Sequence, residues 1–302
     1  MKIVKILGGL GNQMFQFSFF LFLKSKGVKA KLDISDFHKY GLHNGFELAS
    51  IFNVIKNEFV ATEVEINTFK DQSPFLKIRK LLDKVFFKSN NLLVKNTHWI
   101  EPKYSHFYSE IHNSNQTYLD GYWQNENYIN TNDHLIRNSF KWQTIDERNI
   151  KLSTRMALEN SVSIHIRRLD NPGDIKQLLY TIKLRLFWRI ASREYYLKAI
   201  EYFNNKLSNP IFYIFTDNIN WVRKNIPIHN NYIITEWNRG YKSNQDMYLM
   251  TQCKHNIISM SSFSWWGAWL NKNTEKIVIA PKKWAPRFSS KDEIIPKKWI
   301  RL

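Results

Sequence analysis

One stretch of the chain combines a strand-like pattern with residues that can bind an anion. Val162, Ile164 and Ile166 alternate with polar residues, the run continues to Asp170 through Arg-Arg-Leu, and Asn171-Pro-Gly then interrupts it. Alternation of this kind predicts a strand with one face in a core, and the Asn-Pro-Gly breaker predicts its end. The polar residues therefore fall at the carboxyl end of a strand, where open α/β sheets bind ligands.

The two arginines of this stretch suit a diphosphate, because a guanidinium presents a rigid fork of donors to phosphate oxygens. Side chains alternate along a strand, so Arg167 and Arg168 are expected on opposite faces. Arg167 shares a face with His165 and is the one that we expect to reach a ligand. A surface ion pair is the alternative use of such a pair.

Three further polar stretches follow predicted strands and would meet the same ligand. They are the turn Gly8–Gln13, the segment Phe215-Thr-Asp-Asn218, and Ser259-Met-Ser-Ser-Phe-Ser-Trp-Trp-Gly267. The last of these starts a helix, where hydroxyl groups cap the helix and its first N–H groups bind anions. Ser261 and Ser262 therefore have two readings, as helix caps or as anion ligands.

The order of elements that must position these residues predicts an α/β fold. Strands are expected at 162–166, 211–215, 231–235, 255–259 and 276–280, alternating with helices near 194–206, 218–225, 244–253 and 263–271. The chain opens with a strand at 2–7, a glycine turn, a helix at 14–26 and a strand at 28–34, and a further strand is expected at 118–124. This alternation predicts doubly wound parallel sheets. With a boundary in the polar stretch 140–160, we expect Rossmann-like domains at 1–150 and 151–302 that face each other across a ligand-binding cleft.

The opening turn partly matches a dinucleotide fingerprint. Gly9 and Gly11 are present and Asp33 follows at about the spacing that the motif requires, but Met14 stands where the third glycine belongs. We therefore interpret Asp33 as a polar residue that ends a strand.

Composition limits the partners. The 302 residues carry a formal charge of +18, of which residues 1–150 contribute 19 − 15 = +4 and residues 151–302 contribute 25 − 11 = +14. A basic half attracts phosphorylated small molecules, anionic lipid or nucleic acid. No nucleic-acid-binding module is recognisable, so we expect no nucleic-acid partner, and a basic nucleic-acid-binding protein is the remote alternative function. The single Cys253 fits a reducing compartment. With no run of eighteen apolar residues and no signal peptide, a cytoplasmic location is expected.

Two basic segments could rest on an anionic membrane surface. Residues 75–88 and 175–193 each combine apolar positions with several basic ones, and 175–193 holds five basic and no acidic residues. Such helices can lie in a membrane interface. The alternatives are an amphipathic helix with a solvated face for the first and a buried helix for the second.

Taken together, four motifs resemble the α1,2-fucosyltransferases and the superfamily they share with α1,6- and protein O-fucosyltransferases. These motifs are Gly8-Gly-Leu-Gly-Asn-Gln-Met-Phe-Gln16, Leu119-Asp-Gly-Tyr-Trp-Gln124, His165-Ile-Arg-Arg-Leu-Asp170, and Asp246 to Trp269 with its Ser-Ser-Phe-Ser-Trp-Trp run. The resemblance implies a GT-B fold and an inverting, metal-independent transfer of L-fucose from GDP-β-L-fucose. The acceptor would be a galactoside hydroxyl, in a galactose-containing oligosaccharide or lipid-linked glycan of surface-glycan or O-antigen synthesis.

The resemblance also implies roles for individual residues. Arg167 would bind the β-phosphate and stabilise the leaving GDP, and Asn12 would approach the phosphate and fucose. Asp246 would contact guanosine. The remaining donor-binding residues would be Gly9, Gly11, His165, Ser261, Ser262 and Phe263. No metal ligand or cofactor is expected. An α1,6 or α1,3 linkage is the alternative within the same fold.

The group that takes the acceptor's proton stays open. Asp170 and Asp174 are the nearest carboxylates to the arginines, although Asp170 could instead hold them, and Asp120, His43 and Glu47 are candidates in the N-terminal half. A dissociative transition state could also proceed without a strong base. Bacterial α1,2 members usually carry Gly where Leu169 stands, so the resemblance does not imply the local backbone geometry at this position.

Overall fold

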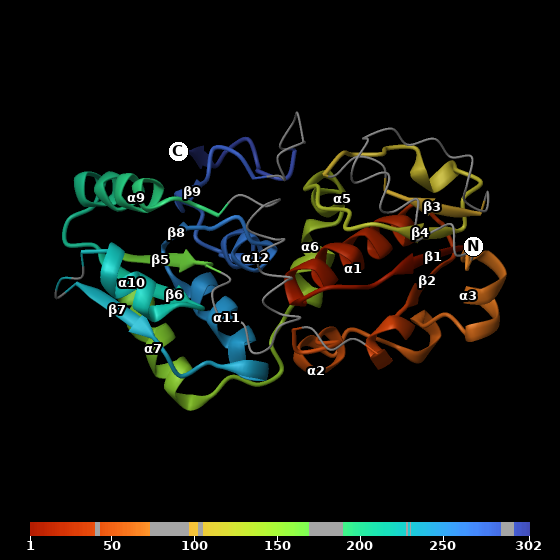
Figure 1. The fold of residues 1–302 in the computed structure, drawn as a ribbon, viewed down its shortest axis with the longest axis horizontal. Helices are drawn as coiled ribbons and strands as arrows, with labels where there is room; N and C mark the ends of the chain where they lie inside the picture. Colours follow the sequence, from red (N-terminus) through yellow and green to blue (C-terminus); the bar gives the residue numbers. More distant parts are fainter. Residues whose placement is uncertain are drawn as a thin grey trace. The chain divides into compact units, whose positions relative to one another are not determined.

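The computed structural model describes the whole chain except residues 40–42, 73–96, 102–104, 169–189, 228, 230 and 285–292. The chain divides into two compact units, Met1–Lys141 and Trp142–Leu302 (Figure 1). Each unit is built around a parallel sheet, as the α/β prediction requires.

The first unit has a four-stranded parallel sheet in the order β2-β1-β4-β3. Its strands are β1 (Lys2–Lys5), β2 (Ala30–Asp33), β3 (His98–Ile100) and β4 (Tyr118–Asp120). From β1 the chain runs to β2 on one side, and β4 pairs with β1 on the other side. The carboxyl ends of β1 and β4 therefore flank the point where the strand order reverses, which is where such sheets bind ligands.

Helix α1 (Leu10–Ser25) is the core of the first unit. It was predicted to start at residue 14 but begins at Leu10, because Gly8 turns the chain sharply at φ +92° and Gly9 is already the N-cap. Its phenylalanines are buried, and the ring of Phe19 stacks on Trp123 with centroids 4.0 Å apart. Asn12 and Gln13 therefore lie in the first turn of a helix rather than in a loop.

Short elements complete this unit. They are η1 (Ser35–Lys39), α2 (Leu48–Phe52), η2 (Asn57–Phe59), α3 (Glu63–Phe69), η4 (Ile111–Asn113), α5 (Asn127–Asn130) and α6 (Asp133–Ser139). The predicted strand 118–124 ends at Asp120, and residues 121–124 form the turn after it.

The second unit has six parallel strands in the order β10-β9-β8-β5-β6-β7. The strands are β5 (Ser161–Ile166), β6 (Ile211–Thr216), β7 (Tyr232–Thr235), β8 (His255–Ile257), β9 (Val278–Ala280) and β10 (Ile300–Arg301). The helices are α7 (Glu147–Leu158), α9 (Arg193–Lys206), α10 (Ile219–Asn225), η5 (Gly240–Ser243), α11 (Asn244–Gln252) and α12 (Ser262–Leu270). The strand order reverses between β5 and β8.

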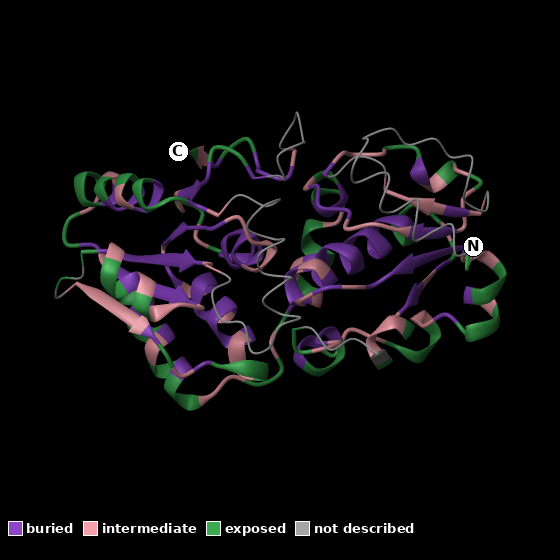
Figure 2. Ribbon diagram, in the orientation of Figure 1, coloured by how far each residue is buried: buried purple, intermediate pink, exposed green. Residues whose placement is uncertain are grey.

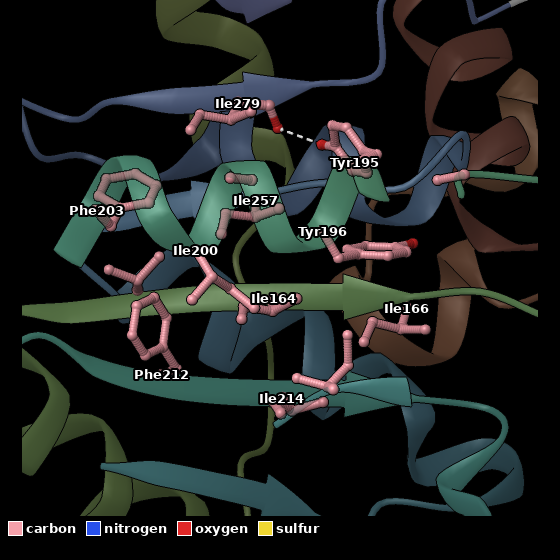
Figure 3. Packing of buried hydrophobic residues seen from close by; sticks show 14 of the residues in the cluster. Ile164, Ile166, Tyr195, Tyr196, Ile200, Phe203, Phe212, Ile214, Ile257 and Ile279 are labelled. Carbon is pink, nitrogen blue, oxygen red and sulfur yellow. Dashed lines mark hydrogen bonds between the residues drawn. The ribbon is translucent and has the colours of Figure 1, made fainter. Parts of the chain in front are cut away.

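Side-chain alternation along β6 divides the core of this unit into two layers. Phe212 and Ile214 join the cluster that α9 and α10 cover, whereas Tyr213 and Phe215 join the cluster formed with α7 and α11. In Figure 3 the side chains of the first cluster interdigitate between α9 and the strands, and the Tyr195 hydroxyl donates to the carbonyl of Ile279 at 3.0 Å. Figure 2 shows β5 and β6 as buried and the outer face of α9 as exposed.

The domain boundary was predicted in the stretch 140–160, and the two units divide there, between Lys141 and Trp142. Helix α7 in the same stretch was not predicted, because part of its buried face is polar: Asn149 and Ser153 are buried beside Met156. An apolar period is therefore missing from its sequence. Strands β3 and β10 were also missed, since three and two residues are too short for a pattern.

Close packing of α12 on α11 generates the first prediction. A Cβ added at Gly267 would lie 2.9 Å from the Cβ of Met250 and 3.1 Å from its Sδ. We expect Gly267→Ala to lower the free energy of unfolding, because overpacking costs about 1–3 kcal/mol and outweighs the helix propensity gained, ~1 kcal/mol. Urea unfolding measures the change. A variant as stable as the wild type would contradict this packing.

Candidate functional site

The polar residues at the end of β5 meet those that follow β8, at the strand-order reversal of the second unit. His165 is buried, and its Nδ1 lies 2.8 Å from the Oγ of Ser259. Its ring also contacts Phe263, with ring centroids 5.6 Å apart. The structure thus brings together the His165 and Ser259–Phe263 stretches that the sequence suggested would share an edge.

His165 is a neutral imidazole in this environment. Burial, followed by the positive charge of Arg167, lowers the pKa of His165 to about 3. A neutral imidazole has one donor and one acceptor nitrogen. His165 can therefore orient Ser259 without adding a second cation beside Arg167.

Arg167 is the partly exposed cation of this edge. Its Nη1 lies 3.2 Å from Oδ2 of Asp217, at the end of β6, and its side chain is 39% exposed. A guanidinium has five N–H donors in a planar fork, so one ion pair leaves capacity for an anion. Asp217 therefore orients the guanidinium and keeps it at the sheet edge.

Arg168 has a different environment. Its backbone N–H donates to Oδ1 of Asp217 at 2.8 Å, and its Nη1 donates to the carbonyl of Ala191 at 3.2 Å. The guanidinium carbon lies 4.2 Å from the ring centroid of Trp221. The Arg168 guanidinium thus packs against Trp221 and Ala191, while the Arg167 guanidinium pairs with Asp217 and is partly exposed.

Helix α12 begins beside this arginine edge. Ser261 is its N-cap, yet the Ser261 side chain makes no capping hydrogen bond, and no acidic residue occupies the first turn. Ser264, one turn into the helix, donates to the carbonyl of Ser261 at 3.3 Å. N–H groups at such a helix start attract anions. The backbone at Ser261, Ser262 and Phe263 is therefore suited to diphosphate oxygens.

Asp246 lies in the first turn of α11 and is almost completely buried. Asn238 donates to its Oδ1 at 2.8 Å. Burial raises the pKa of Asp246 to about 7, despite the hydrogen bond from Asn238 and the nearby charge of Arg239. A buried carboxylate of this kind suits a ligand edge that carries N–H donors.

Asn218 and Asp217, in the predicted site segment after β6, make hydrogen bonds and an ion pair within the protein. The Asn218 side chain caps α10 by accepting from the backbone N–H of Trp221 at 2.8 Å. Asp217 holds both arginines.

The first unit has its own polar edge where β1 and β4 part. A Cβ at Gly8 would lie 2.7 Å from Nδ2 of Asn12, so the amide of Asn12 folds back over the turn. Gln124, after β4, donates to Oδ1 of Asn12 at 2.7 Å. Gly9 lies against His43, since a Cβ there would be 3.3 Å from its ring. Asn12 is thus fixed by contacts from both strands of the reversal.

Several carboxyl groups line this first edge. Asp120 lies 3.5 Å from Nζ of Lys5 and 3.8 Å from Nε2 of His98. Burial raises the pKa of Glu47, which accepts from the side chain of Asn44 and the backbone of Leu10.

Glu101 is a further carboxyl that the sequence gave no reason to single out, because it is a lone acidic residue after a three-residue strand. Its Oε2 accepts from the backbone N–H groups of Tyr122 and Trp123, at 2.7 and 3.2 Å. Burial raises the pKa of Glu101 to about 7.

The carboxylate of Asp33 is engaged in hydrogen bonds within the first unit. It ends β2 and accepts from the Tyr118 hydroxyl at 2.6 Å and from Ser35. This agrees with its interpretation as a strand-end residue.

Some candidate residues lie outside the described part of the chain. These are Asp170 and Asp174, the basic helix 75–88, and residues 175–189 of the segment 175–193. In the described end of that segment, Ser192 caps α9 by accepting from the backbone N–H of Tyr195 at 3.2 Å. Among the described residues, no three His, Cys, Asp or Glu side chains converge as a metal site would require.

The sequence as a whole matches one protein family. The model of glycosyl transferase family 11 covers residues 1–302. The chain belongs to this family. It is therefore a glycosyltransferase, and the resemblance to α1,2-fucosyltransferases that its motifs indicated is confirmed.

Two curated relatives match this family 11 chain over nearly its whole length. An α1,2-colitosyltransferase of Escherichia coli is 31% identical over 310 residues, covering 99% of this chain and 98% of the relative. The O-antigen biosynthesis glycosyltransferase WbnK of Escherichia coli is 29% identical over 318 residues, covering 98% of each chain.

A solved structure shares the fold. The α1,6-fucosyltransferase NodZ, co-crystallised with GDP, matches with a TM-score of 0.50 at 14% identity, over 88% of this chain and 90% of NodZ. The same enzyme has been crystallised from Bradyrhizobium. This likeness agrees with the two parallel-sheet units and confirms the predicted GT-B type of α/β fold.

In the parts of this glycosyltransferase that the structure describes, no helix is long and apolar enough to cross a bilayer.

The neutral burial of His165 predicts a pH effect on stability. An unfolded histidine titrates near ~6.5, whereas the pKa of folded His165 is about 3. Between these values the unfolded state binds a proton that the folded state does not, so stability is lost as pH falls. We expect the stability advantage of wild type over His165→Gln, measured by urea unfolding, to shrink from pH 7 to pH 5. An advantage that stays constant would mean that His165 is not buried as a neutral group.

Proposed function

We propose that this glycosyltransferase moves L-fucose from GDP-β-L-fucose to a galactoside hydroxyl, forming an α1,2 linkage with inversion and without a metal ion. The observation that supports this most directly is the contact of His165 with Ser259 and Phe263, which brings the end of β5, where Arg167 follows, to the start of α12 at the strand-order reversal of the second unit. A guanidinium and a ring of backbone N–H groups can together neutralise a departing diphosphate.

In the proposed reaction the acceptor oxygen attacks the anomeric carbon from the face opposite to the diphosphate. The bond from that carbon to the β-phosphate oxygen breaks, and the electron pair leaves with GDP. Arg167 stabilises the charge that develops on the β-phosphate. The acceptor proton passes to a base, for which Asp170 and Asp174 remain proposals alongside Asp120, His43 and Glu47 on the first unit.

Further residues are proposed to contact the donor. His165, Ser261, Ser262 and Phe263 would line the diphosphate. Asp246 would accept hydrogen bonds from guanine. Gly9, Gly11 and Asn12 would lie against the phosphate and the sugar. The reaction would need no other cofactor.

A galactose-containing oligosaccharide or lipid-linked glycan of O-antigen synthesis is the proposed acceptor. The name of the relative WbnK supports this assignment. The proposal that residues 75–88 and 175–193 contact an anionic membrane would bring the enzyme to a lipid-linked acceptor.

A second donor sugar is favoured by one specific observation, the relative named as an α1,2-colitosyltransferase. Colitose is L-fucose without its 3-hydroxyl. GDP-colitose and GDP-fucose therefore share the same nucleotide and differ only at that position of the sugar. Assays with GDP-fucose and GDP-colitose in parallel, with NMR of the product, distinguish the two. Transfer of fucose with an α1,2 linkage supports the first proposal, and exclusive transfer of colitose replaces it with the second.

The role of Arg167 is tested by titrating GDP calorimetrically in the presence of EDTA. We expect Arg167→Ala to weaken GDP binding by about 2–3 kcal/mol, since it removes a charge-assisted contact to phosphate. Arg223→Ala is the matched control, because Arg223 is an exposed arginine of the same unit that pairs with Glu236. Equal affinity in the two variants, or GDP binding by wild type that EDTA abolishes, would contradict the proposal.

The carboxyl of Asp246 makes GDP binding depend on pH. With a pKa of about 7, Asp246 is increasingly protonated below pH 7, and a protonated carboxyl no longer accepts at both oxygens. We therefore expect the GDP affinity of wild type to fall toward pH 6, and that of Asp246→Asn to fall less. The terminal phosphate of GDP titrates near ~6 in both proteins, so the difference isolates the carboxyl. Parallel pH profiles would show that Asp246 does not contact the base.

A further inference from the structure

A chain of buried side-chain hydrogen bonds ends on Asp246. The indole Nε1 of Trp237 donates to Oδ1 of Asn149 at 2.8 Å. Nδ2 of Asn149 donates to Oδ1 of Asn238 at 2.9 Å, and Nδ2 of Asn238 donates to Oδ1 of Asp246 at 2.8 Å. Asn149 and Asn238 are 0% and 3% exposed, so water does not substitute for these bonds.

The direction of this chain is fixed by chemistry. An indole nitrogen can only donate, so the atom of Asn149 that faces Trp237 must be its oxygen. The amide nitrogen of Asn149 then donates to Asn238 and also to Oε1 of Gln245 at 2.6 Å, while its oxygen accepts a second, longer bond from Nδ2 of Asn238 at 3.3 Å. Asn238 in turn can present only its nitrogen to Asp246. The carboxyl oxygen at the end of the chain is thereby required to act as an acceptor.

Three separate elements contribute to the chain. Asn149 belongs to α7, Trp237 and Asn238 follow β7, and Asp246 belongs to α11. Asp246 is the member of this chain that is proposed to contact the ligand. Asn238 bonds directly to its carboxyl, whereas Asn149 and Trp237 are linked to it only through Asn238.

We propose that Trp237, Asn149 and Asn238 are positioning residues that hold one carboxylate oxygen of Asp246 as an acceptor and so select guanine as the base of the nucleotide. This rests on the proposed function. Guanine carries two adjacent N–H donors, at N1 and at the exocyclic amine, and a carboxylate with about four lone-pair sites can accept both while it keeps the bond from Asn238. Hypoxanthine lacks the exocyclic amine, and adenine presents an acceptor at N1.

Among the described residues, Arg239 is the cation whose charge acts on Asp246. Arg239, after β7, also donates to the carbonyl of Thr216. On α7 and η5 the charges pair among themselves: Lys242 lies 2.9 Å from Asp146. Helix α12 carries no ionisable side chain.

The other charges near the chain also have partners. Arg148 stacks on the Trp237 ring, with its guanidinium carbon 3.6 Å from the ring centroid. Asp217, at the end of β6, is paired with Arg167. Loss of the hydrogen bond from Asn238 would therefore leave Arg239 as the main group that favours the charged form of Asp246.

The experiment measures GDP and IDP affinities by calorimetry between pH 6 and pH 9, on wild type and three variants. Asn238→Ala removes the donor to Asp246. Trp237→Phe removes the indole N–H donor and keeps a smaller aromatic ring for Arg148. Asn271→Ala is the matched control, since Asn271 is another buried amide of the same unit that bonds to Cys253 and Asn256, at the far end of α11.

Wild type is expected to bind GDP at least about tenfold more tightly than IDP, the equivalent of one charge-assisted hydrogen bond. Asn238→Ala should reduce this ratio several-fold and move the pH midpoint of GDP binding upward, because the charged carboxylate loses a donor. Trp237→Phe should shift both in the same direction by less. Asn271→Ala should leave both unchanged even if it lowers stability.

Failure of the amide chain and failure of GDP binding give different results. If wild type binds GDP but Asn238→Ala and Trp237→Phe keep its GDP/IDP ratio and pH midpoint, the amide chain is only structural and this inference is wrong. Equal affinity of wild type for GDP and IDP also overturns it. If wild type binds no GDP at any pH in the series, the proposed function fails and the inference fails with it.

Discussion

The site depends on one electrostatic constraint: a guanidinium must stay charged, oriented and partly exposed at the carboxyl end of a buried strand. Asp217 provides the orientation from the neighbouring strand. His165, two residues before Arg167 in the chain, stays neutral because it is buried. A second positive charge at that position would repel the guanidinium and would require its own counterion. The apolar layer under β5 therefore determines the electrostatics above it.

The proposed phosphate contacts depend on the backbone at this edge as well as on Arg167. The reversal of strand order between β5 and β8 leaves the start of α12 next to the end of β5. Gly267 allows α12 to pack closely on α11, which in turn carries Asp246. Positions that bind no ligand thus fix the distance between the proposed phosphate and base contacts. Buried amides around Asn149 join α7 to this arrangement.

Much of the second unit could be predicted because its strands have apolar residues at regular intervals. Val162, Ile164 and Ile166 gave β5 to within one residue, and the two arginines after it could be placed at a sheet edge. Helix α7 could not be found in this way, because Asn149 and Ser153 take positions where an apolar period would be sought. Contacts between residues that are far apart in the sequence could not be predicted either. Nothing local in the sequence links Trp237 to Asn149, 88 residues away.

In the first unit the glycine turn was recognised, but its geometry was not. The helix begins at Leu10, so Asn12 is a helical residue whose amide is held by Gln124. That contact spans 112 residues and depends on the order of β1 and β4 in the sheet. Glu101 likewise acquires its raised pKa only through burial next to the turn at 121–123. Sequence patterns locate such residues on elements but do not give their environment.

The most direct measurement of the central claim is a crystal structure of the enzyme grown with GDP. The account predicts the β-phosphate within hydrogen-bond distance of the Arg167 guanidinium and of backbone N–H groups at Ser262 or Phe263, with the guanine edge at Asp246. A nucleotide bound away from the ends of β5 and β8, or a diphosphate held by a divalent cation without contact to Arg167, would contradict it.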